Sequence, residues 1–143
     1  MLKVRDIMIK NVVTAKDGIT AEKAIDMLYK KHVGSIVIID DEEKCAGIFT
    51  ERDAIRIVAQ KIPLNTQLKE VMTRKVKTIR EGATLEEARR YIVSNGIRHL
   101  PVIDRKGKLV GLLSIRDFLD EIFGLSPGSQ NFRREQSREA FSG

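Results

Sequence analysis

The 143-residue sequence has no tryptophan, one cysteine and two histidines, and these scarcities exclude several kinds of function. Because Cys45 is alone, no disulfide can form within the chain, which favours a reducing, cytoplasmic location. The low aromatic content, 5%, argues against a base-stacking surface for single-stranded nucleic acid. The sequence also has no phosphate-binding Gly-Lys-Ser/Thr loop and no His-Glu-x-x-His pairing. We therefore expect no catalytic residues, no metal site and no enzyme activity.

Long apolar runs are missing as well. No run approaches the roughly 18 residues that cross a membrane, and the N-terminus lacks a secretory signal, so we expect no membrane contact. The composition, 42% hydrophobic and 32% charged, predicts a folded core under a heavily solvated surface. The net charge of +6 is compatible with nucleic-acid binding, but basic residues are interleaved with acidic ones, as in the segment 86–90. Such mixing is typical of an ion-paired surface.

The chain repeats itself. Shifting it by 64 residues, with no gap, aligns Gly47 with Gly111 and the pair Arg52-Asp53 with Arg116-Asp117. The same shift aligns Thr20-Ala21-Glu22 with Thr84-Leu85-Glu86. So many identities in one register indicate two copies of one unit. We place the first repeat at 1–62, the second at 66–124, and a polar, basic tail at 125–143.

Each copy predicts the order β-α-β-β-α, so the fold class is α+β. Thr20 and Thr84 are expected helix N-caps. The helices after them should bury Ala24, Ile25 and Leu28 in one copy and Ala88, Ile92 and Val93 in the other. A strand containing Pro101 suggests an edge or strand-start position. The expected strands are 12–15, 35–39 and 46–49, and 76–79, 99–103 and 110–113, with last helices beginning near 51 and 115.

One segment occurs in both copies where a strand passes directly into a helix. Thr50 and Asp53 stand at the first of these junctions, and Ser114 and Asp117 stand at the second. A helix N-terminus offers unpaired N–H groups and a positive dipole end, so a hydroxyl there can contact a phosphate and a carboxylate can accept hydrogen bonds from a ribose. The same Thr/Ser-x-x-Asp spacing also fits a capping box, in which the side chains only satisfy backbone N–H groups.

The doubled unit resembles the CBS domain family, named after cystathionine β-synthase. The resemblance rests on Asp6-Ile7-Met8, on the segment Gly96–Asp104 and on the two junction motifs, and it covers about residues 3–123. It implies two CBS repeats packed with pseudo-twofold symmetry as a stand-alone module. It also implies two clefts for AMP, ADP or ATP, with S-adenosylmethionine or NADH as alternatives and no obligatory cofactor.

The resemblance also implies which residues bind the nucleotide. The Asp of each junction would hold the ribose, the Ser or Thr would contact phosphate, and strand residues would enclose the adenine, largely through backbone groups. The first site would use Thr14, Ala15, Ile36, Val37, Thr50 and Asp53, and the second Thr78, Ile79, His99, Leu100, Pro101, Ser114 and Asp117, with Arg52, Arg98 and Arg116 as phosphate partners.

The expected function is a regulatory module that senses an adenine nucleotide and signals to an unknown partner protein. The family resemblance implies a homodimer in which the apolar faces of the junction helices bury one another. Two alternatives stay open: a basic nucleic-acid-binding protein, and a structural dimerisation module whose Asp residues only cap helices.

Overall fold

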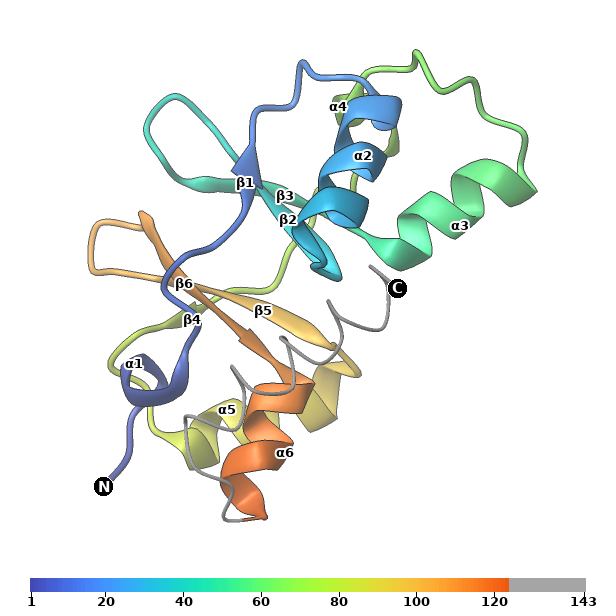
Figure 1. Cartoon of the computed structure of the whole chain (residues 1–143). Coiled ribbons are helices and arrows are strands. Elements are labelled where there is room, and N and C mark those ends of the chain that lie inside the picture. Colours follow the sequence, from blue (N-terminus) through green and yellow to red (C-terminus); the bar gives the residue numbers. More distant parts are fainter. Residues whose placement is uncertain (124–143) are drawn as a thin grey trace.

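The computed structural model describes residues 1–123 and contains two three-stranded sheets, each with its own helices (Figure 1). The two sheets face each other in the middle of the molecule, and the helices lie on the outer sides. The α+β class and the two-repeat architecture predicted from the sequence are confirmed. The predicted tail, 125–143, lies outside the described residues.

The repeats have the same element order. In repeat one, the strands are β1 (Thr14–Ala15), β2 (Ser35–Ile39) and β3 (Cys45–Thr50), and the helices are α2 (Ala21–Lys31) and α3 (Glu51–Ala59). In repeat two, the strands are β4 (Ile79–Arg80), β5 (His99–Ile103) and β6 (Leu109–Ser114), and the helices are α5 (Leu85–Asn95) and α6 (Ile115–Ile122). In each sheet the central strand pairs in parallel with the short strand and antiparallel with the long one.

Helices α2 and α5 are capped as their sequences predict. The hydroxyl oxygens of Thr20 and Thr84 accept hydrogen bonds from the backbone N–H groups of Lys23 and Glu87, both at 3.1 Å. One prediction about α5 was wrong, because Val93 is 70% exposed. It follows directly after Ile92, and adjacent residues are about 100° apart around a helix, so Val93 is carried off the buried face.

Each repeat begins with a short helix that the sequence patterns do not predict. Each of these two helices packs against the other repeat and not against its own. Helix α1 (Val4–Ile7) packs in the core of repeat two, while α4 (Leu68–Val71) packs in the core of repeat one. Val4 and Leu68 are both fully buried there. The hydrophobic core of each repeat is therefore completed by the chain segment that opens the other repeat.

The exchange brings the residues after each short helix against a glycine of the opposite sheet. A Cβ atom at Gly47 would lie 2.9 Å from the sulfur of Met72 and 2.9 Å from the carbonyl oxygen of Thr73. The backbone of Thr73 also exchanges hydrogen bonds with Ile48, at 3.0 and 2.9 Å. At this position glycine is required by close approach of the backbone and not by its conformation.

Pro101 departs from the expected edge position, since it is the buried third residue of the central strand β5. At the matching position of repeat one, the N–H of Val37 donates to the carbonyl oxygen of Val13 at 3.1 Å. Proline has no N–H and cannot make this bond. Correspondingly, β4 begins at Ile79, one residue later than β1 in the repeat alignment, and Thr78 precedes the strand.

The tips of the two β-hairpins also meet. Lys44 and Lys108 form an isolated antiparallel bridge, and the N–H of Leu109 donates to the carbonyl oxygen of Glu43 at 3.0 Å. Within residues 1–123, no helix is both long enough and apolar enough to cross a membrane.

Candidate functional site at the inter-repeat junction

Side chains alternate between the two faces of each sheet. This alternation divides the predicted binding residues into a group that faces the hydrophobic core and a group that faces the other repeat. In repeat one, Ile36 and Phe49 point into the hydrophobic core together with Ala15. Thr14, opposite Val37, and Thr50, opposite Ser35, lie on the other face, which is turned toward repeat two. The strand register therefore brings Thr14, Val37 and Thr50 to one face.

The same division holds in repeat two. Leu100 and Ile79 belong to the hydrophobic core, whereas His99, Pro101 and Ser114 lie on the face turned toward repeat one. Ala15, Ile36, Ile79 and Leu100 can therefore meet a ligand only through their backbone groups, which is the mode that the family resemblance implies for the adenine.

Thr50 and Asp53 form a complete capping box at the start of α3. The N–H of Thr50 donates to Asp53 Oδ2 at 2.9 Å, and the N–H of Asp53 donates to Thr50 Oγ1 at 3.3 Å. The Asp53 side chain is 13% exposed, and its other oxygen, Oδ1, lies 3.7 Å from the Nη2 atom of Arg56. The capping alternative is thus present in the structure, but capping uses only Oδ2. A carboxylate has about four acceptor positions, so Oδ1 keeps the capacity to accept from a ligand hydroxyl.

The second junction shares the backbone frame of the first. The N–H of Ile115 donates to the carbonyl oxygen of Arg98 at 2.9 Å, as the N–H of Glu51 donates to that of Gly34 at 3.1 Å. Arg52, Arg98 and Arg116, the three expected phosphate partners, are all exposed. Asp117 lies on α6, and its side chain is not among those described.

The two junctions lie beside each other across the repeat boundary. A Cβ atom at Gly34 would lie 3.6 Å from the Cε1 atom of His99 and 3.8 Å from the Cδ atom of Glu51. In the repeat alignment, Gly34-Ser35 stands where repeat two has Arg98-His99. The sequence patterns above did not single out Glu51. Repeat two has Ile115 at the position of Glu51, so the two copies differ in charge at the start of the last helix. This difference is the sequence signal that could have identified Glu51.

The described residues give no support for a metal centre. Within residues 1–123, no three or more His, Cys, Asp or Glu side chains are grouped so that they could hold a metal ion. The burial of Cys45 raises the pKa of its thiol, and its sulfur lies 3.7 Å from the carbonyl oxygen of Gly47. A thiol with a raised pKa is a weak nucleophile at neutral pH.

The fold and the paired strand-to-helix junctions define a tandem-repeat binding module. A sequence profile of the CBS domain matches residues 4–60 and again residues 68–124. The chain belongs to the CBS domain family, and its two repeats form a CBS domain pair. This pair is a regulatory module and not a catalytic fold.

Related sequences match mainly over this pair. MJ1225 of Methanocaldococcus jannaschii is 38% identical over 116 residues, which are 81% of this chain and 41% of that protein. A 17.7 kDa protein of Acidianus ambivalens is 34% identical over 80% of this chain and 70% of its own length. The inosine-5'-monophosphate dehydrogenase of M. jannaschii is 30% identical over 82% of this chain, but the match covers only 23% of the enzyme.

Solved structures show the same architecture. The CBS domain pair of protein MJ0100, in complex with 5'-methylthioadenosine and S-adenosyl-L-methionine, has a TM-score of 0.78 and 28% identity. The alignment covers 87% of this chain and 97% of that one. The CBS-domain-containing protein ATU1752 of Agrobacterium tumefaciens has a TM-score of 0.74 and 27% identity, covering 84% and 98% of the two chains.

Proposed function

We propose that this CBS pair binds an adenine nucleotide, AMP, ADP or ATP, between its two repeats and thereby regulates a partner protein. The observation that carries the proposal is the position of Thr50 and Asp53. Both stand at the N-terminus of α3, and Thr50 lies on the sheet face turned toward the other repeat. This places a hydroxyl, a carboxylate and helix N–H groups where a ribose and its phosphate could be held together.

In the proposed complex, Asp53 keeps its capping bond through Oδ2 and accepts from the ribose hydroxyls through Oδ1. Thr50 and the exposed Arg52 contact the phosphate, and Thr14 and Val37 border the adenine. By the repeat symmetry, Ser114, Asp117 and Arg116 take the corresponding roles in the second site, where Arg98 adds a positive charge. The second site should therefore prefer a ligand with more phosphate.

S-adenosylmethionine and 5'-methylthioadenosine are the second candidate ligands. They bind the CBS pair of MJ0100, which is 28% identical to this chain. Both contain adenosine, so an Asp that holds the ribose would serve them equally. They differ from the nucleotides in lacking phosphate, and Arg52, Arg98 and Arg116 favour the phosphorylated compounds.

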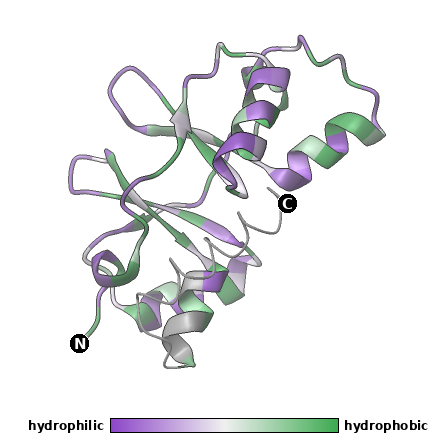
Figure 2. Ribbon diagram, in the orientation of Figure 1, coloured by the Kyte–Doolittle hydropathy of each residue, from purple (hydrophilic) through white to green (hydrophobic). Residues whose placement is uncertain are grey.

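Regulation would follow from differential binding. A ligand that contacts both repeats favours the arrangement in which it fits best, and a partner that recognises this arrangement responds to the ligand. We also propose a homodimer, because the helices that start at the two junctions expose apolar side chains. On α3, Ile55 and Val58 are 69% and 73% exposed, and on α6, Ile115 and Leu119 are 40% and 43% exposed. Figure 2 shows hydrophobic positions between hydrophilic ones along α3.

The test is calorimetric titration of the purified chain with AMP, ADP, ATP, S-adenosylmethionine and 5'-methylthioadenosine. A ligand present at 100 times its Kd should stabilise the fold by about 2.7 kcal/mol. Asp53→Ala should weaken binding about tenfold or more, since a charged hydrogen bond to the ribose is lost. Thr84→Ala, which removes an N-cap away from the junctions, is the matched control and should leave the affinity unchanged.

If no adenine compound binds, or if Asp53→Ala and Thr84→Ala have the same affinity as the unchanged chain, the nucleotide proposal is wrong. Binding to duplex DNA or RNA that weakens steeply with salt and ignores Asp53 would instead support the nucleic-acid alternative.

A further inference from the structure

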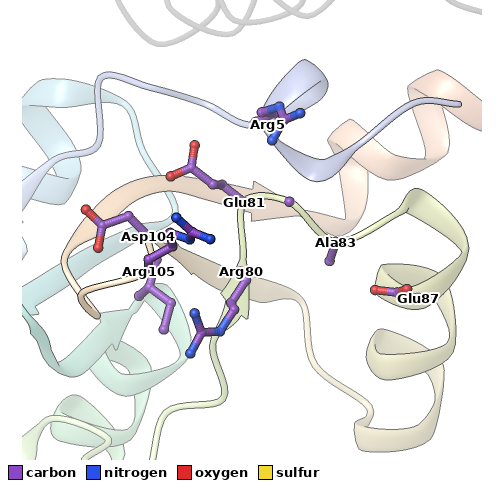
Figure 3. A pocket seen from close by; sticks show the side chains of 9 residues that line it. Arg5, Arg80, Glu81, Ala83, Glu87, Asp104 and Arg105 are labelled. Carbon is purple, nitrogen blue, oxygen red and sulfur yellow. The ribbon is translucent and has the colours of Figure 1, made fainter.

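A hollow of about 510 Å³ lies at the carboxyl ends of β4 and β5, at the far end of the second sheet from His99 and Ser114 (Figure 3). Three segments of the chain line it: α1, the segment from the end of β4 through the loop to the first turn of α5, and the end of β5 with the turn after it. None of the residues assigned above to nucleotide binding lines this hollow. It is therefore a separate feature of repeat two.

Three arginines border the hollow. Arg5 comes from α1, Arg80 from β4 and Arg105 from the turn after β5. All three are exposed, and within residues 1–123 their guanidinium groups make neither an ion pair nor a hydrogen bond. The Arg5 Nη1 atom lies over Gly82, 3.8 Å from where a Cβ atom would be.

The corresponding place in repeat one shows why these cations are unpaired. Lys16 and Asp41 occupy the positions of Arg80 and Arg105 in the repeat alignment. The Lys16 Nζ atom lies 3.1 Å from Asp41 Oδ1 and donates to the carbonyl oxygen of Asp40 at 2.8 Å. Repeat two has Arg105 in place of that aspartate, so Arg80 lacks the counter-ion that Lys16 has in repeat one.

Carboxylates also border the hollow and narrow the choice of ligand. Asp104 is engaged in its own turn, where its Oδ1 accepts from the N–H groups of Lys108 at 3.0 Å and Lys106 at 2.8 Å. Glu81 and Glu87 make no such bonds with their carboxylates within the described chain, and Glu87 stands apart on α5 (Figure 3). A ligand that is anionic at one end and rich in hydroxyl groups at the other would bind the arginines through its anionic end and donate hydrogen bonds to the glutamates through its hydroxyl groups.

We propose that this hollow is a second binding site, for a small phosphate monoester that carries hydroxyl groups. Arg80 and Arg105 hold the phosphate, since guanidinium groups bind phosphate oxygens through paired, charge-assisted hydrogen bonds. Arg5 closes the site from α1. Glu81 and Glu87 accept hydrogen bonds from the hydroxyl groups. Because α1 belongs to the exchanged segment, occupancy of this site would tie the start of the chain to repeat two.

Ribose 5-phosphate is a suitable probe, with inorganic phosphate and ribose as its two halves. Calorimetric titration of the full chain should show saturable binding of ribose 5-phosphate, weaker binding of phosphate and no binding of ribose. Arg105→Asp recreates the acid of repeat one and should pair with Arg80. It should weaken ribose 5-phosphate binding about tenfold or more, and Arg80→Gln should act in the same direction.

Lys31→Gln, which removes one exposed positive charge from the end of α2 in the other repeat, is the matched control and should bind like the unchanged chain. Thermal melting of each variant checks that the fold is intact, and Arg80→Gln serves if Arg105→Asp does not fold. The proposal is overturned if ribose 5-phosphate does not bind saturably, if Lys31→Gln weakens it as much as Arg105→Asp, or if ribose binds as well as its phosphate. Asp53→Ala should leave this binding intact, so the outcome does not depend on the nucleotide site.

Discussion

The Arg56 Nη2 atom donates a hydrogen bond to the carbonyl oxygen of Val71 at 2.6 Å. The same nitrogen lies 3.7 Å from Asp53 Oδ1. Arg56 therefore connects the junction aspartate of repeat one with the last residue of α4, the exchanged helix that opens repeat two. In the repeat alignment, the position of Arg56 is taken by Asp120, so a cation at this place is a property of repeat one alone.

We expect Arg56→Met to lower the free energy of unfolding by about 1–2 kcal/mol, because an orphan carbonyl at the end of α4 would lose its charged donor. Urea unfolding followed by circular dichroism measures this change. Arg90→Met is the control, since Arg90 makes only an exposed 3.7 Å contact with Glu86, and such pairs contribute little. Equal stability of the two variants would show that the Arg56 bond does not hold α4 in place.

The capping box predicts a loss of stability that is separate from any loss of binding. Thr50→Ala and Asp53→Ala should each lower the free energy of unfolding of the ligand-free chain by about 1 kcal/mol, the usual effect of losing a cap. Thr84→Ala should cost about the same. Differential scanning calorimetry without ligand checks this. If Asp53→Ala is no less stable than the unchanged chain, the capping bond of Asp53 makes no net contribution to stability.

Gly47 should not tolerate a side chain. A Cβ atom there would lie 2.9 Å from the Thr73 carbonyl oxygen, so Gly47→Ala forces the exchanged segment away from β3 at a cost of about 1–3 kcal/mol. Gly18→Ala is the control, because no atom lies within 4 Å of its Cβ position. Thermal unfolding of both variants distinguishes them, and a Gly47→Ala protein as stable as Gly18→Ala would contradict the observed packing.

Much of the fold follows from local sequence signals. The caps at Thr20 and Thr84, the apolar runs of β2 and β5 and the 64-residue repeat are all properties of neighbouring residues or of simple periodicity, and they predicted the element order. The exchange of α1 and α4 was not predicted, because four-residue helices carry almost no periodic signal. Their place is decided by tertiary contacts of Val4 and Leu68 with the opposite core.

The site could be predicted only in part, because local sequence signals located some of its residues and tertiary contacts decided the rest. The junction motif located Thr50 and Asp53, but sequence could not separate the residues that face the other repeat from those that face the core. That separation depends on strand register, which places Ile36 in the core and Val37 on the opposite face. The arginine-lined hollow depends on contacts among three distant segments, so only the difference between Asp41 and Arg105 hinted at it.

The two hairpin turns predict a dependence of stability on pH. The N–H of Lys44 donates to Asp40 Oδ1 at 3.0 Å, and the N–H of Lys108 does the same to Asp104, which lowers the pKa of both carboxyl groups. A pKa that is lower in the folded than in the unfolded state stabilises the fold above the ordinary aspartate pKa, and this contribution is lost as the pH falls through the folded pKa.

Asp40→Ala and Asp104→Ala should therefore lower the Tm at pH 7, and the difference from the unchanged chain should shrink below about pH 4. Melting curves across this range measure the effect. Asp26→Ala, which removes an exposed carboxylate 3.2 Å from Lys30, should change the Tm little at any pH. A deficit in Asp40→Ala that stays constant from pH 7 to acid would mean that the turn does not depend on the carboxylate charge.

The exposed apolar residues on α3 predict how the proposed dimer can be broken. Ile55 and Val58 are three positions apart, so they lie on one side of the helix, and both are more than two-thirds exposed. Burying them against a second copy would remove apolar area from water, whereas a charge at either position would have to be buried unpaired.

Ile55→Glu and Val58→Glu should each weaken dimerisation about 30-fold or more, the effect of losing a central contact of about 2 kcal/mol. Val93→Glu is the control, because Val93 is 70% exposed on α5, which does not begin at a junction, and it should leave the dimer intact. Sedimentation velocity over a range of concentrations gives the dissociation constants. A chain that is already monomeric, or a Val93→Glu variant that dissociates as readily as Ile55→Glu, would show that α3 is not the dimer interface.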